Sequence, residues 1–198
     1  MPPQPPSLSP GNPEPGRIRV FGIIHLVFGG LGVISALGGI LWLVFQEEIM
    51  GVTNTGEPPE LVAVQEKLHR DVASHSWISI VFSLIVSILI LRAGIALMKR
   101  RRSSVRLSNT YAFASLVAKV VGVFLFFVMV VPVVSGALET MLGESIPDPD
   151  AQAVLAGIKI LMVVAGVLFP LMGAIYPLCT ILMLNKAQVR EFLEKNGT

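Results

Sequence analysis

Residues 111–134 read YAFASLVAKVVGVFLFFVMVVPVV, and this stretch decides the fold. It is longer than the roughly 20 apolar residues that a helix needs to cross a bilayer at about 1.5 Å per residue. Lys119 interrupts it about 20 Å along the helix from Arg106, close to the expected middle of the membrane. An ionisable side chain at that depth is costly unless it is paired, hydrated or neutral. The stretch therefore predicts a membrane-spanning helix that contains one unusual polar position.

The composition of the whole chain agrees with a membrane location. Of the 198 residues, 53% are hydrophobic and 14% are charged, and the mean hydropathy is +0.74, far above that of a soluble domain. The net charge of +2 gives no reason to expect a nucleic-acid partner. The only cysteine, Cys179, excludes an intrachain disulfide and any chemistry that needs two thiols. The sequence predicts an integral membrane protein.

Three further apolar stretches extend the prediction to an all-α, integral membrane four-helix bundle with up-down-up-down topology. The membrane domain covers residues 17–186, with spans at about 20–45, 77–98, 108–134 and 157–185. Residues 1–16 are rich in proline and are predicted to form a disordered cytoplasmic tail. Residues 187–198 are predicted to form a basic amphipathic cytoplasmic tail at the membrane surface. In the first outer loop, apolar residues from Leu61 to Val72 recur at helical spacing, which predicts a short amphipathic helix that stands alone or continues into the second span.

The positions of the basic residues predict the orientation of the chain. Positively charged residues near the ends of membrane spans stay preferentially on the cytoplasmic side. With four spans, two basic residues, Lys67 and Arg70, fall on one side, and ten fall on the other. We therefore expect both termini to be cytoplasmic, in a bacterial inner membrane or a plasma membrane. The ten are Arg17, Arg19, Lys99, Arg100, Arg101, Arg102, Arg106, Lys186, Arg190 and Lys195.

Small residues recur on one face of each predicted helix. Helices in a bilayer approach each other closely where small residues meet, because lipid offers no hydrophobic driving force for their association. At the start of the second span, Ser76, Ser79, Ser83 and Ser87 follow one another at spacings of three or four residues. This spacing predicts a helix face that can hydrogen-bond to a neighbour. The predicted packing residues are Gly22, Gly29, Gly32, Gly39, Gly122, Gly166 and Gly173.

A possible intramembrane polar site consists of Lys119, His25, Tyr176 and Ser115. Ser115 and Lys119 share a helix face, so the lysine is expected to point at other helices. Two interpretations remain open. Lys119 either binds an anion, an anionic headgroup or a carboxylate, or it is held neutral and titrates. Alternatively, its amine is structural and donates to carbonyls freed by Pro170 or Pro177, or to Tyr176.

Reactive groups are scarce in the predicted spans. They contain no Asp or Glu, and none of the common hydrolase, metalloprotease or phosphate-loop motifs occurs. His69 and His75 are six residues apart, so we expect them to face different sides of a helix and not to share a metal. The sequence predicts no enzyme activity, no cofactor and no metal site.

The leading functional prediction is a non-catalytic membrane protein that scaffolds or modulates a membrane complex. Its expected partners are membrane lipids and either further copies of the chain or another membrane protein. The alternative is a transporter or channel subunit that binds an anion or an anionic lipid at Lys119. A polar cavity that reaches Lys119 favours the alternative, whereas a dry core favours the scaffold.

Overall fold

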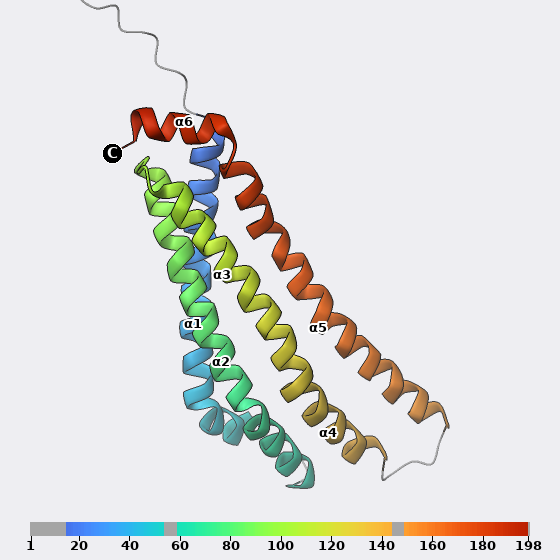
Figure 1. Ribbon diagram of the computed structural model, residues 1–198. Coiled ribbons are helices and arrows are strands. Elements are labelled where there is room, and N and C mark those ends of the chain that lie inside the picture. The colour runs from blue at the N-terminus through green and yellow to red at the C-terminus, as the bar shows by residue number, and fades with distance from the viewer. Residues whose placement is uncertain (1–14, 54–58, 144–148, 198) are drawn as a thin grey trace, which may run out of the picture.

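The computed structural model describes residues 15–53, 59–143 and 149–197, and within these ranges the chain is helical and contains no strand (Figure 1). Most of the predicted N-terminal tail, residues 1–14, lies outside the described residues. A π-helical segment, η1, continues the third long helix. The elements are α1 (Gly16–Thr53), α2 (Pro59–Met98), α3 (Ser104–Leu125), η1 (Phe126–Val130), α4 (Val131–Gly143), α5 (Pro149–Leu184) and α6 (Ala187–Asn196).

Four helical stretches are long and apolar enough to cross a membrane, and each overlaps one predicted span. They are Gly16–Gln46, Val62–Met98, Ser104–Thr140 and Gln152–Leu184. This confirms the all-helical character of the chain and is compatible with a multi-pass membrane protein. The short amphipathic helix expected in the first outer loop is not a separate element in the described residues, because α2 runs without interruption from Pro59 into the second span.

The hydrogen-bond pattern of the third span changes from α-helical to π-helical just before a proline. Pro132 has no backbone N–H, so it cannot make the bond to the carbonyl one turn earlier. The π-helical turn η1 ends at Val130, two residues before this proline, and such turns relieve a local break in the pattern. The helix then continues as α4 to Gly143, so Pro132 does not end it.

The long helices pack in the order α1, α2, α3 and α5, each beside the next, and α6 lies across one end (Figure 1). That end holds a cluster of buried apolar residues contributed by α1, α2, α3, α5 and α6. Val189, Phe192 and Leu193 of α6 belong to it, so the apolar face of the C-terminal helix packs on protein. The sequence had suggested that this face lies on the membrane surface. The other members are Ile18 of α1, Leu97 of α2, Val105 of α3 and Leu184 of α5.

A tight turn joins α2 to α3 at the end covered by α6. Arg100 adopts a left-handed conformation with φ of 51°, which non-glycine residues rarely do. The N–H of Arg101 donates to the carbonyl of Ala96 at 2.9 Å, and the N–H of Arg100 donates to that of Leu97 at 3.0 Å. This pair of bonds is a common way to satisfy the last carbonyls of a helix. It holds the basic run 99–102 at the helix end.

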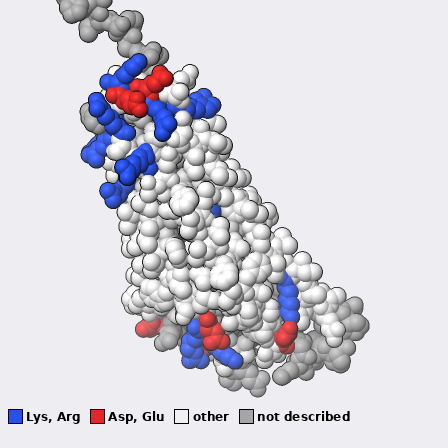
Figure 2. Space-filling model, in the orientation of Figure 1, with Lys and Arg blue, Asp and Glu red and all other residues white. Residues whose placement is uncertain are grey.

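Most charged residues gather at the two ends of the molecule, and the band between them is almost free of charge in this view (Figure 2). Lys and Arg dominate the end that carries α6, with some acidic residues among them. Side chains of both signs are present at the opposite end. An apolar band between two charged ends is the distribution expected for a chain that crosses a bilayer.

The predicted packing glycines of α1 all lie against α2. A Cβ atom at Gly29 would lie 2.6 Å from Leu91 Cγ, and one at Gly22 would lie 2.9 Å from Met98 Sδ. One at Gly32 would collide with the hydroxyl of Ser87, and one at Gly39 would lie 3.1 Å from Ile80 Cδ1. These glycines let the two helices approach closely along their length.

The other three predicted packing glycines behave differently from one another. A Cβ at Gly166 would collide with the ring of Phe126, and one at Gly173 would lie 3.0 Å from Lys119 Cε, so both mark contacts of α5 with the third span. A Cβ at Gly122 would meet nothing within 4 Å. Gly122 therefore marks no close helix contact in the structure. It lies on the side of α3 that lines a cavity.

Candidate intramembrane polar site

Lys119 is half-buried on α3 and bends back toward the preceding turn. Its Nζ donates a hydrogen bond to the hydroxyl of Ser115 at 3.2 Å. Ser115 is 2% exposed, so this partner is fixed inside the protein. The aliphatic stem of Lys119 lies against Gly173 of α5, where a larger residue would crowd it. The contact explains why a glycine suits that position of α5.

The amine of Lys119 keeps hydrogen-bonding capacity that the described part of the chain does not use. An ammonium has three N–H groups, and Ser115 is the one partner that it has among the described residues. The alternative partners considered from the sequence, carbonyls freed by the prolines of α5 and the hydroxyl of Tyr176, do not bond to it. The remaining N–H groups are therefore available to water or to a ligand.

A cavity of about 270 Å³ between α2 and α3 reaches Lys119. Serine side chains of both helices line it together with apolar residues and Gly122. Ser87 is almost fully buried and donates its hydroxyl to the carbonyl of Ser83 at 2.7 Å. The polar groups in the lining are Ser79, Ser83, Ser87, Ser115 and Lys119. A cavity with this lining can hold water or a polar group, whereas an apolar void stays dry.

His25 and Tyr176 form a second polar contact that joins α1 to α5. The Nδ1 atom of His25 lies 2.6 Å from the hydroxyl oxygen of Tyr176, and His25 is fully buried. Which of the two donates depends on the tautomer of the imidazole. Aromatic rings surround the pair, with Phe21 stacked on Tyr176 and Tyr111 edge-on to His25. This contact is enclosed by aromatic rings, unlike the cavity at Lys119.

The four predicted polar residues therefore divide into two pairs. Ser115 belongs to Lys119, and Tyr176 belongs to His25. The pairs are neighbours along α5, because Gly173 touches Lys119 and Tyr176 follows three residues later, about 4.5 Å along the axis. The sequence grouped these four residues as one site and did not reveal that they form two separate contacts.

Two features of the site escaped the sequence reasoning. Tyr111 is buried beside His25, and its position one turn before Ser115 places it on the face that carries Lys119, which is a signal that could have found it. The serines of α2 were recognised as a hydrogen-bonding face but were not connected with Lys119. Their connection depends on which helices are neighbours, and spacing within one helix carries no such information.

A second cavity, of about 440 Å³, lies between α1 and α2 toward the end opposite α6. Its lining includes Gln46 of α1 and His69, His75, Ser76 and Ser79 of α2. His69 and His75 both line this cavity, although six residues separate them on α2. His69 Nδ1 donates to the carbonyl of Gln65 at 2.9 Å. Among the described residues, no group of three or more His, Cys, Asp or Glu side chains is arranged to hold a metal ion.

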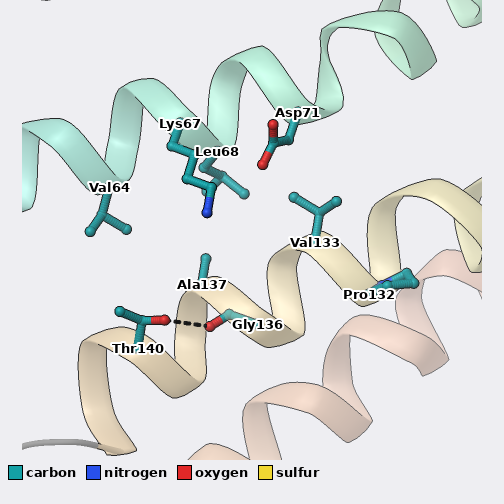
Figure 3. A pocket seen from close by; sticks show the side chains of 9 residues that line it. All are labelled: Val64, Lys67, Leu68, Asp71, Pro132, Val133, Gly136, Ala137 and Thr140. Atoms are coloured by element: carbon teal, nitrogen blue, oxygen red, sulfur yellow. Dashed lines mark hydrogen bonds between the residues drawn. The ribbon is translucent and has the colours of Figure 1, made fainter.

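A third cavity, of about 330 Å³, lies between α2 and α4 and is separate from the polar site (Figure 3). Lys67 and Asp71 project from α2 into the gap, and both are exposed. On the α4 side, the hydroxyl of Thr140 donates to the carbonyl of Gly136 at 3.0 Å. None of the nine residues that line this cavity lines the one at Lys119. Its two charged side chains belong to the water-facing rim of the bundle.

Comparisons of the chain with protein-family models, with curated proteins and with solved structures find no match.

Proposed function

We propose that this multi-pass membrane protein is a transporter or channel subunit that binds an anionic group at Lys119. The observation that carries the proposal is the polar cavity in which a half-buried ammonium has a single neutral partner, Ser115. The hydroxyls of Ser79 and Ser83 can donate to an anion in the same cavity, and a charge-assisted hydrogen bond from the amine adds to them. A small inorganic anion and the phosphate of a lipid headgroup share the chemistry that this site recognises.

The polar cavity favours anion binding over the leading prediction from the sequence. A scaffold that only associates with other proteins needs no polar cavity between its own helices, and such a cavity lowers the packing contacts that hold a bundle together. Retaining a lysine there is costly without a ligand or water to solvate it. Association with another copy or another membrane protein remains compatible with the exposed apolar helix faces.

The proposal includes an up-down-up-down topology with both termini in the cytoplasm. Its support is the cluster beneath α6, which gathers the first turn of α1, the last turns of α2 and α5, and the first turn of α3 at one end. The same end carries most of the Lys and Arg side chains (Figure 2), and positively charged residues favour the cytoplasmic side. In this arrangement the α1–α2 connection lies on the outer side.

Native mass spectrometry tests the proposed function on the full chain extracted gently from its own membrane. We expect the wild-type protein to retain a small anion or an anionic lipid that Lys119→Met loses and Lys119→Arg keeps. Lys159→Met is the matched control, because Lys159 belongs to an ion pair with Glu139 at 2.5 Å and lies away from the cavity. This control should retain the anionic species as the wild type does.

Two results would contradict the proposal. One is retention of the same anionic species by Lys119→Met, provided that its circular dichroism and gel-filtration profile match the wild type. The other is a fixed-ratio complex with another membrane protein, with no anionic species in any preparation. The second result would restore the scaffold as the better account of the chain.

A further inference from the structure

The cavity at Lys119 and the cavity between α1 and α2 meet at one residue. Ser79 lines both of them. The first extends from Ser79 toward Ser87 and Lys119, and the second extends from Ser79 toward Gln46 and His69. The two hollows are therefore consecutive along α2, with the lysine at one end and the rim of the bundle at the other.

A row of hydroxyl groups follows α2 along both cavities. Ser76, Ser79, Ser83 and Ser87 are separated by three or four residues and so share one face of the helix. Ser87 lies 11 residues after Ser76, so the row extends over about 16 Å of helix axis. At the outer end the lining adds the polar side chains of Gln46 and His75. Water has hydrogen-bonding partners at each step of such a path.

The charge of the lining also follows a pattern. Lys119 is the one Lys, Arg, Asp or Glu residue among the described residues that line either cavity. The cavity between α2 and α4 differs, because its lining contains the carboxylate of Asp71 as well as Lys67. A path with one fixed positive charge at its inner end and no carboxylate in its lining attracts anions and disfavours cations.

We infer that the serine face of α2 forms a water-accessible route along which a small water-borne anion reaches Lys119 from the end of the bundle opposite α6. The inference rests on the proposed function, since Lys119 is the destination of the anion. It adds a direction of access and a source, the aqueous phase and not the surrounding lipid. It also assigns the serines a role beyond helix packing.

Cysteine labelling tests the route on the full chain. Cys179, the single cysteine, is first replaced in Cys179→Ala, and single cysteines are then introduced by Ser79→Cys and Ser83→Cys. Val81→Cys and Ile85→Cys are controls at similar depth on the same helix, because both residues are exposed and neither lines either of these two cavities. Membrane-impermeant methanethiosulfonates, one anionic and one cationic, are added from the side of the α1–α2 connection. Thiols react as thiolates, which form in water and not in hydrocarbon.

Both serine-derived cysteines should react from that side, with the control cysteines slower by on the order of tenfold or more because they face lipid. The anionic reagent should react faster than the cationic one at Ser83→Cys, and Lys119→Met should lower that preference by about tenfold. Lys119→Arg should preserve the preference.

Three outcomes overturn the inference in different ways. Equal rates at Ser83→Cys and Val81→Cys mean that no water-filled route exists, and they leave a lipid headgroup as the possible ligand of Lys119. Reaction with an uncharged, lipid-soluble maleimide alone means that the site is reached from the bilayer. Reaction with both charged reagents at equal rates means that the route holds water but that Lys119 attracts no anion, in which case the proposed function fails as well.

Discussion

Lys119 and His25 are both polar side chains inside an apolar bundle, but their surroundings differ. His25 is fully buried, and one of its nitrogens is paired with the hydroxyl of Tyr176. Its other nitrogen is buried without a partner in the described part of the chain. Lys119 is half-buried and has a polar cavity beside it. These environments suit the histidine to a structural role and are consistent with the binding role proposed for the lysine.

The His25–Tyr176 contact should be measurable as a coupling energy. In Tyr176→Phe the hydroxyl is lost, and Nδ1 of His25 is left without that partner, so we expect the protein to become less stable by about 0.5–2 kcal/mol. A double-mutant cycle with His25→Leu, followed by reversible unfolding in detergent, isolates the pair from its surroundings. Additive effects of the two substitutions would show that the hydrogen bond contributes nothing to stability.

Lys119→Met should leave the fold as stable as the wild type or more stable by about 1 kcal/mol, because an apolar side chain of similar length replaces a half-buried charge. Anion retention should be lost in the same protein. Unfolding in detergent and native mass spectrometry measure the two properties on one preparation. A structural lysine predicts the opposite pattern, in which the substitution destabilises the bundle and leaves ligand content unchanged.

At the scale of the helices, the packing face of α1 was largely predictable. Glycine spacing in the first span identified the face of α1 that meets α2, because a close approach in lipid requires small residues. The partner of each face was not predictable, since periodicity within one helix says nothing about its neighbour. For this reason the sequence grouped His25 with Lys119 and did not connect Lys119 with the serines of α2.

Gly94 of α2 should be the most sensitive glycine of this contact. A Cβ there would lie 2.9 Å from His25 Cβ and 3.0 Å from the backbone nitrogen of Leu26, and neither atom can move without separating the helices. We expect Gly94→Ala to destabilise the protein by about 1–3 kcal/mol in detergent unfolding. In Gly122→Ala, the control, a Cβ meets nothing within 4 Å, so helix propensity should leave stability unchanged or raise it by up to about 1 kcal/mol. A similar loss in both variants would contradict this account.

For the molecule as a whole, the sequence predicted the helical class and the distribution of charge, because hydropathy and basic residues are read directly from the chain. It did not predict how α6 is used. An amphipathic helix can place its apolar face on lipid or on protein, and the sequence pattern is the same in both cases. The apolar face packs on protein where the ends of the long helices offer a common apolar surface. Here Ile18, Leu97 and Leu184 form that surface, and α6 covers it.

Because α6 packs across the ends of the long helices, we expect it to stabilise the bundle, and a substitution at Leu193 tests this expectation. Leu193 is 1% exposed in the cluster that joins α6 to the long helices, so Leu193→Ala should lower the free energy of unfolding by about 2–5 kcal/mol. Glu194→Ala, at the exposed neighbouring position, should change it by less than about 0.5 kcal/mol. Reversible unfolding of the purified protein in detergent gives both values. If α6 instead lay on lipid, Leu193→Ala would reduce the affinity of that helix for vesicles and leave the stability of the bundle unchanged. A loss confined to Leu193→Ala would mean that α6 holds the ends of the long helices together.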